Sequence, residues 1–243
     1  MNPLISMPDF IPVSPVIVAL DFNHPDQAMD FVSKLSPQMC QLKIGKELFT
    51  ATGYHFVETL INRGFKIFLD LKYHDIPNTV AQACKIAAQM GVWMVDIHTM
   101  GGSRMMHAAA EAIASFSNRP LLIGVTILTS IETTDLQEIG ITVPPDEMVL
   151  RLAILAQKSG LDGVVCSAQE AAFLRTHLTQ DFALVTPGIR PAGHNQKDDQ
   201  RRIMTPEMAL AAGSSYLVIG RPITQAANPV AVIQQINTIK KQQ

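Results

Sequence analysis

The chain has 243 residues, 47% of them hydrophobic and 16% charged, and its formal net charge is −2. This composition provides for a large buried core and excludes a disordered chain, while the near-neutral charge gives no indication of a nucleic-acid or acidic-membrane partner. No apolar run approaches the roughly 18 residues that a membrane span requires, and the opening residues lack the basic and apolar regions of a signal peptide.

Eight short runs of apolar and β-branched residues are predicted as strands. Each is bounded by polar or glycine-containing segments. In chain order the runs are Val16–Leu20, Gln41–Ile44, Lys66–Leu71, Met94–His98, Leu121–Leu128, Gly163–Cys166, Ala183–Thr186 and Tyr216–Ile219.

Longer amphipathic or alanine-rich stretches separate these runs and are predicted as helices. Several end at a glycine just before the next strand, which is a common C-terminal stop of a helix. In chain order the stretches are Pro25–Leu35, Gly53–Arg63, Asn78–Met90, Arg104–Ser115, Pro145–Ser159, Glu170–His177, Thr205–Ala212 and Gln225–Ile239.

Eight strand–helix units in this length predict a (β/α)₈ barrel in its compact form, a single α/β domain over residues 1–243. An open, doubly wound sheet is the alternative, because alternation alone does not settle closure. Polar residues at the strand ends favour the barrel, because charged groups are costly in an apolar core and in a closed barrel these ends share one mouth. They include Asp21, Lys43, Asp70, Lys72, Asp96, His98, Thr126, Thr129, Ser167, Thr186 and Arg221.

The first candidate site combines Lys43, Asp70, Lys72 and Asp75. A period of two along the third strand, extended to Lys72, puts Asp70 and Lys72 on one face, and Asp75 follows in the next loop. Two carboxylates alone would raise one pKa, and lysines between them favour both negative charges. Such a set suits an anionic substrate and proton donation from a lysine. The structural alternative is a salt-bridge network at the barrel rim.

A second candidate site follows the last two strands. The segment Thr186–Arg190 contains Gly188, and Gly220 and Arg221 follow the eighth strand. Barrels often bind phosphate with these two loops, where glycine lets backbone N–H groups approach and an arginine grips two oxygens. Alternatively, the glycines only make turns and Arg221 is a surface charge.

A polar segment near residues 190–202 lies between these loops, and we interpret it as a mobile lid. Gln200 is the residue of this segment that we expect to contact the ligand. The alternative is an ordinary surface loop. The basic pair Arg201 and Arg202 is interpreted as solvated surface.

The sequence gives no indication of a metal or an organic cofactor. The seven histidines are scattered without metal-ligand spacing, and no glycine-rich nucleotide loop follows a strand. Asp96 and His98 share one strand face, and we expect a hydrogen-bonded pair there. The cysteines Cys40, Cys84 and Cys166 stand far apart in apolar surroundings, so we expect buried free thiols and a cytoplasmic protein.

Several motifs resemble the orotidine 5'-phosphate decarboxylase family, and its bacterial branch in particular. The segment Asp70–Val80 reads DLKYHDIPNTV, and the likeness extends over almost the whole chain. Further matching segments are Val18–Asp21, Leu42–Gly45, Leu128–Ser130, Gly163–Ser167, Val185–Arg190 and Val218–Arg221.

The resemblance implies a homodimeric barrel that converts orotidine 5'-monophosphate to uridine 5'-monophosphate and CO₂, the last step of de novo UMP synthesis, without metal or cofactor. Lys72 would donate the proton to C6 of the pyrimidine, Asp70 would lie beside the departing carboxylate, and Lys43 would organise the charges and contact the ribose. The remaining implied residues are Asp21 for the ribose, Thr129 for the pyrimidine, Arg190, Gln200, Gly220 and Arg221 for the phosphate, and Asp75 and Thr79 for the partner subunit's site.

Two other functions stay open. A related family, 3-keto-L-gulonate 6-phosphate decarboxylase, shares the D-x-K-x-x-D motif but uses Mg²⁺, and it carries a glutamate where this chain has Lys43. A non-enzymatic barrel that binds phosphosugars is the more distant alternative. Four charges in one mouth without a chemical use would be costly, which argues against it.

Overall fold

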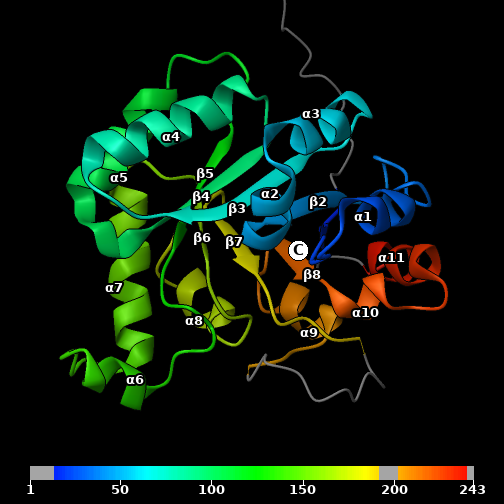
Figure 1. The fold of residues 1–243 in the computed structure, drawn as a ribbon. Helices are drawn as coiled ribbons and strands as arrows, with labels where there is room; N and C mark the ends of the chain where they lie inside the picture. The colour runs from blue at the N-terminus through cyan, green and yellow to red at the C-terminus, as the bar shows by residue number, and fades with distance from the viewer. Residues whose placement is uncertain (1–13, 192–201, 240–243) are drawn as a thin grey trace, which may run out of the picture.

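The computed structural model describes residues 14–191 and 202–239, which form a closed (β/α)₈ barrel. Every strand pairs in parallel with the next one along the chain, and β8 pairs with β1, so the predicted barrel is confirmed and the open sheet is excluded (Figure 1). The strands are β1 Val16–Ala19, β2 Gln41–Gly45, β3 Ile67–Tyr73, β4 Met94–His98, β5 Leu121–Val125, β6 Gly163–Val165, β7 Ala183–Thr186 and β8 Tyr216–Ile219.

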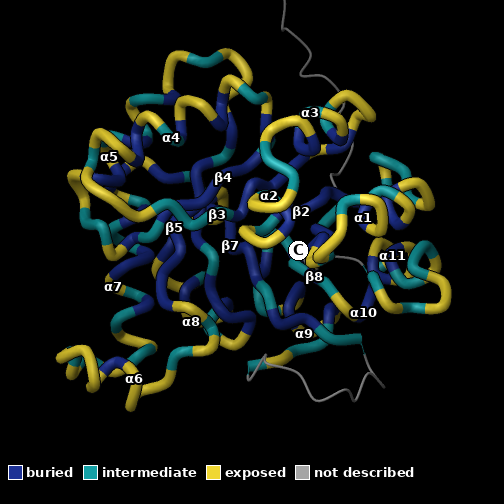
Figure 2. Tube along the Cα trace, in the orientation of Figure 1, coloured by how far each residue is buried: buried dark blue, intermediate teal, exposed yellow. Residues whose placement is uncertain are grey.

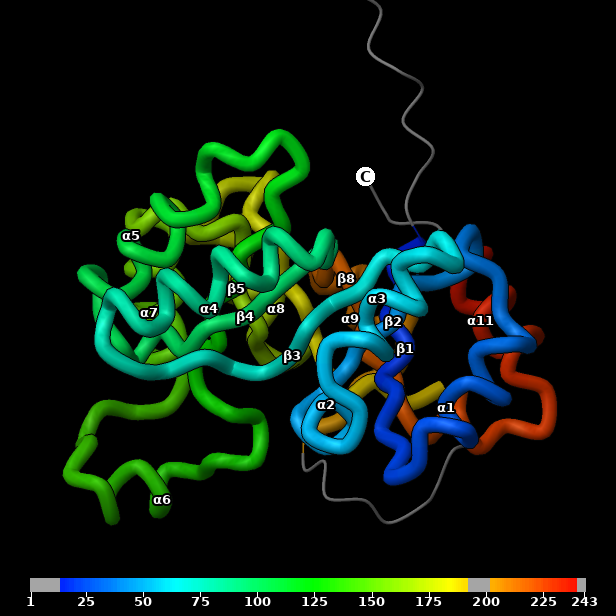
Figure 3. The backbone as a smooth tube through the Cα atoms, turned by 45° about the horizontal axis from the view of Figure 1, so that its top comes forward, coloured from blue at the N-terminus to red at the C-terminus, as the bar shows by residue number. Residues whose placement is uncertain are grey.

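Helices surround the barrel, and the segment that carries α6 projects away from it (Figure 3). A 3₁₀ turn, η1, covers Thr99–Gly101 after β4. The helices are α1 Pro25–Val32, α2 Lys46–Thr52, α3 Tyr54–Asn62, α4 Pro77–Gln89, α5 Gly102–Ile113, α6 Thr133–Glu138, α7 Pro145–Lys158, α8 Ala171–Arg175, α9 Pro206–Ala211, α10 Arg221–Thr224 and α11 Pro229–Asn237.

Three of these helices were not predicted: α2, α6 and α10. The helix α2 begins directly after β2 with no intervening loop, and Gly53, at a φ of +64°, separates it from α3. The fifth strand ends at Val125, three residues earlier than predicted. The apolar run continues to Leu128, but residues 126–130 leave the sheet at the barrel mouth.

The strands are buried on both faces, as parallel strands covered by helices usually are (Figure 2). Their outward side chains pack beneath the helices in the main core. The inward side chains fill the barrel centre in a second cluster of Ile17, Phe68, Met94, Ile123, Ala183 and Val185. The described part of the chain contains no helix with the length and apolar character needed to span a bilayer. All three cysteines are buried free thiols, as expected.

The pairing of β3 with β4 is irregular in the middle of the candidate motif. Leu69 pairs with Val95, but the next pair is Tyr73 with Ile97, so β3 accommodates two extra residues. Lys72 lies in this bulge with a φ of +51° and is the only non-glycine residue with a positive φ among the residues described. The strand therefore runs through Lys72, but with a bulge that the period of two does not predict, and Asp70 and Lys72 face each other as expected.

Candidate active site

A cavity of about 380 Å³ opens at the carboxyl ends of the strands. Residues that end different strands, or follow them, line it together because a closed barrel gathers these ends at one mouth. Eight residues predicted from the sequence line this cavity: Asp21, Lys43, Asp70, Lys72, Thr129, Arg190, Gly220 and Arg221.

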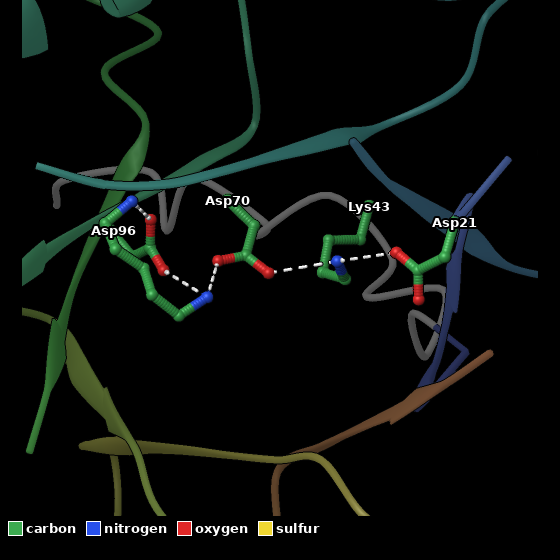
Figure 4. A network of polar contacts seen from close by, with 5 residues as sticks. Asp21, Lys43, Asp70 and Asp96 are labelled. Atoms are coloured by element: carbon green, nitrogen blue, oxygen red, sulfur yellow. Dashed lines mark hydrogen bonds and ion pairs between the residues drawn. The ribbon is translucent and has the colours of Figure 1, made fainter. Parts of the chain in front are cut away.

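Five ionisable side chains form a continuous row across the mouth, in the order Asp21, Lys43, Asp70, Lys72 and Asp96 (Figure 4). The ammonium of Lys43 lies 3.4 Å from Asp21 Oδ1 and 3.0 Å from Asp70 Oδ2. Lys72 Nζ contacts Asp70 Oδ1 and lies 3.9 Å from Asp96 Oδ2. Carboxyl and ammonium groups alternate along the row.

Burial and charge oppose each other at Lys43 and Asp70, and charge prevails at both. Burial acts to lower the pKa of Lys43, but Asp70 and Asp21 raise it above its ordinary value. Burial acts to raise the pKa of Asp70, but Lys43 and Lys72 hold it well below the usual range. Both groups are therefore charged at neutral pH, and their mutual contacts fix them in place.

Asp96 ends the row on β4 and is completely buried. Its Oδ1 accepts a hydrogen bond of 2.8 Å from the backbone N–H of Lys72, while Oδ2 has no hydrogen-bond partner in the described structure. Burial and the negative charge of Asp70 raise the pKa of Asp96 well above its ordinary value. Asp96 was not among the residues predicted to form the site.

The expected hydrogen bond between Asp96 and His98 is absent from the described residues. The bulge in β3 presents the Lys72 amide to Asp96, and this amide takes its place. The ring of His98 instead packs against that of His74, with centroids 5.4 Å apart. Burial, together with the charges of His74, Lys72 and Lys46, lowers the pKa of His98 to about 4, so the ring is neutral at physiological pH.

Three predicted site residues are not part of this cavity as described. Asp75 is exposed, and its carboxylate accepts the N–H of Ile76 at 2.6 Å; Thr79 lies exposed on the first turn of α4. Gln200 and most of the predicted lid lie outside the described residues. Within residues 14–191 and 202–239, no three His, Cys, Asp or Glu side chains are grouped so that they could hold a metal ion.

An ion pair that the sequence did not predict joins three loops at the cavity mouth. Arg202 pairs with Glu170, and its Nε donates to the carbonyl of Thr129 at 3.3 Å. Glu170 in turn accepts the N–H of Ser167 at 2.9 Å. Interpreting Arg202 as solvated surface was therefore wrong, because loops distant in sequence meet here and bury it partly.

Comparison with known proteins gives one consistent family. Residues 14–236 match the family described as "Orotidine 5'-phosphate decarboxylase / HUMPS family". A protein of Neisseria meningitidis with the name orotidine 5'-phosphate decarboxylase is 66% identical over 242 residues, 98% of either chain. A protein of Chromobacterium violaceum with the same name is 63% identical over 237 residues, which cover 98% of this chain and 96% of the relative.

A solved structure agrees with these matches. The crystal structure of orotidine 5'-phosphate decarboxylase from Lactobacillus acidophilus superposes with a TM-score of 0.81 and 42% sequence identity. The superposition covers 92% of this chain and 97% of that one.

Proposed function

This chain belongs to the orotidine 5'-phosphate decarboxylase / HUMPS family, and we propose that it converts orotidine 5'-monophosphate to uridine 5'-monophosphate and CO₂ with Lys72 as the proton donor. The observation that carries the mechanism is the row of alternating carboxyl and ammonium groups, in which Lys72 lies between Asp70 and Asp96 and lines the cavity. The proposed substrate is an anion with a carboxylate and a phosphate. The cavity is lined by two lysines, Lys43 and Lys72, and by two arginines, Arg190 and Arg221.

The chemistry requires a cation at the reacting carbon. When the bond from C6 of the pyrimidine to the carboxylate breaks, its electron pair stays on C6, in the plane of the ring and without an adjacent carbonyl to accept it. A fixed ammonium stabilises that developing charge and then transfers a proton to C6. Lys72 suits this step because its contact with Asp70 orients the ammonium before the substrate binds.

Asp70 and Lys43 keep this arrangement charged in a site shielded from water. Lys43 binds Asp70 from the side opposite to Lys72, so Asp70 remains a carboxylate between two ammonium groups. The substrate carboxylate would lie beside Asp70. Lys43 also reaches Asp21, and the two together offer a donor and an acceptor to the ribose hydroxyls.

The loops after β7 and β8 are proposed to hold the phosphate. Arg190, Gly220 and Arg221 line the same cavity as Lys72. A Cβ atom added at Gly220 would lie 3.3 Å from Asp21 Oδ2, so the glycine keeps room between the phosphate loop and the ribose site. Gln200 is proposed as a further phosphate contact. Binding energy from this remote group can then be used at the reacting carbon.

We further infer a homodimer in which Asp75 and Thr79 complete the partner's site. Both residues are exposed at the start of α4, outside the cavity of their own chain. Apolar side chains are exposed on this helix as well: Ile76, its N-cap, at 67% and Ile86 at 54% of their surface. α4 also packs side by side with α5, which gives a broad, continuous surface for a partner (Figures 1 and 3).

The reaction is tested by mixing the purified protein with orotidine 5'-monophosphate in the presence of EDTA and following the absorbance. We expect rapid loss of the substrate band and formation of uridine 5'-monophosphate. Lys72→Ala should abolish turnover and keep the fold. Lys66→Ala is the matched control, because Lys66 lies over Trp93 outside the cavity. Near-normal turnover by Lys72→Ala would refute the proton-donor role, whereas Mg²⁺-dependent turnover of a sugar phosphate alone would refute the substrate.

Subunit exchange tests the shared site. Asp75→Asn and Lys72→Ala homodimers should both be inactive. Mixed heterodimers should regain one working site, because one of the two sites then combines an intact Lys72 with the partner's intact Asp75. Demonstrated heterodimers without recovery would contradict the shared site.

A further inference from the structure

We propose that Asp96 is a positioning residue that holds Lys72 in its reactive place by accepting the Lys72 backbone N–H. The inference rests on the proposed role of Lys72 but concerns a residue outside the cavity. Asp96 is fully buried and does not line the cavity, so it acts through Lys72 rather than on the substrate.

The backbone of Lys72 needs such a partner. Its φ of +51° lies in the left-handed region, which is unfavourable for an L-residue with a side chain. The bulge between Leu69 and Tyr73 also interrupts the regular ladder with β4. A buried N–H without an acceptor would add a further penalty. The hydrogen bond of 2.8 Å from this N–H to Asp96 Oδ1 satisfies the donor and holds the strained conformation.

The sheet fixes Asp96 itself on both sides. Its neighbours Val95 and Ile97 pair with β3 immediately before and after the bulge, and Asp96 pairs with Ile123 of β5. The carboxyl group therefore projects from a rigid strand to the one segment of β3 that departs from regular geometry. Such a rigid support is what a precisely placed catalytic ammonium requires.

The acceptor oxygen, rather than a negative charge, accounts for this role. The distance from Asp96 Oδ2 to Lys72 Nζ is 3.9 Å, too long for a hydrogen bond, so the ammonium is held by Asp70. Burial and the proximity of Asp70 favour the neutral form of Asp96, as the direction of its pKa shift indicates. A neutral amide carbonyl in the same position would accept the Lys72 N–H equally well.

Two kinds of substitution separate the acceptor from the charge. Asp96→Asn keeps an acceptor of the same size and should retain kcat within about threefold, whereas Asp96→Ala should lower kcat by roughly 100-fold with KM little changed. Asp96→Leu, which has side-chain bulk but no acceptor, should behave like Asp96→Ala and serves if the alanine variant does not fold.

Asp162→Ala is the matched control. Asp162 also accepts a strand N–H, that of Leu122 at 2.8 Å, but it does not line the cavity and pairs with Arg119. Its loss should lower the melting temperature and leave kcat unchanged. If Asp96→Asn loses as much kcat as Asp96→Ala, or if Asp96→Ala retains kcat, the positioning role is refuted.

Crystal structures of the Asp96 variants give a readout that does not depend on turnover. Lys72 should keep its left-handed backbone in Asp96→Asn and leave it in Asp96→Ala or Asp96→Leu. If wild-type protein fails to decarboxylate orotidine 5'-monophosphate, the proposed function fails, and the structures still decide whether Asp96 holds Lys72. An unchanged Lys72 in the variants that lack the acceptor would overturn the inference.

Discussion

Replacing Lys43 with methionine would leave the buried carboxylate of Asp70 with one ammonium instead of two. Lys43 Nζ lies 3.0 Å from Asp70 Oδ2, and both side chains are only 10% exposed. Methionine keeps the unbranched bulk of lysine but removes its charge, so the change isolates electrostatics from packing.

The expected loss of stability follows from this distance and burial. Two unit charges 3.0 Å apart attract by about 5.5 kcal/mol at an effective dielectric constant of about 20. Part of this lost attraction is offset because the Lys43 ammonium no longer has to be desolvated. Removing one partner of a buried ion pair costs about 3–5 kcal/mol in general. We expect the free energy of unfolding at pH 7 to fall by about that amount.

The loss should depend on pH with a defined sign. A carboxyl whose folded pKa is lowered stabilises the fold above its unfolded pKa, and this stability disappears as the pH falls through the folded pKa. Lys43 is a main cause of the lowered pKa of Asp70. The difference in the free energy of unfolding between wild type and Lys43→Met should therefore be largest near pH 7. It should become smaller below the ordinary carboxyl pKa of about 4.

Urea unfolding followed by circular dichroism measures this effect, at one protein concentration because dissociation of the proposed dimer would contribute. Adding Asp70→Asn to Lys43→Met removes the isolated carboxylate and should recover most of the stability but no turnover. A loss below about 1 kcal/mol, or no recovery in the double variant, would refute the reasoning that Lys43 compensates a buried charge.

Three further substitutions test other parts of the structure. Arg221→Ala should raise KM by roughly 10- to 100-fold with a smaller change in kcat, because a hydrogen bond to a charged group contributes about 1.5–3 kcal/mol; unchanged KM would contradict the phosphate site. Gly45→Ala places a Cβ 3.2 Å from Lys43 Nζ and should lower kcat/KM about tenfold without a large change in melting temperature. Gly163→Ala places a Cβ 2.3 Å from the backbone oxygen of Ala183 and should destabilise the fold by at least about 1–3 kcal/mol, measured by urea unfolding.

The sequence was sufficient for the barrel and for most of the mouth because both follow from local patterns. Apolar runs alternating with helical stretches predict parallel strands, and closure brings the ends of these strands together. Lys43, Asp70 and Lys72 could thus be assigned to one site without any knowledge of their distances. The stretch from Leu121 shows the limit, since its apolar pattern continues after the strand has left the sheet.

Asp96 could not be found in this way. A regular strand places Asp96 and His98 on one face, and this period suggested that they pair. The bulge that brings the Lys72 N–H to Asp96 has no glycine to mark it, because Lys72 itself adopts the left-handed conformation. The ion pair of Arg202 and Glu170 could not be predicted for a related reason, because it depends on loops that meet only in the folded barrel.

The uneven exposure of the side chains in the row from Asp21 to Asp96 fits the proposed reaction, which consumes a proton in each turnover. Exposure of the side chains is 59% for Asp21, 10% for Lys43 and Asp70, and zero for Asp96, but 24% for Lys72. A donor that transfers its proton to C6 becomes a neutral amine and must regain a proton from solvent before the next cycle. A lysine as buried as Lys43 would be poorly supplied with protons, whereas Lys72 remains accessible to solvent through the cavity. The same opening would admit water to the carbanion, so efficient turnover requires that the bound substrate itself fill the cavity during the chemical step.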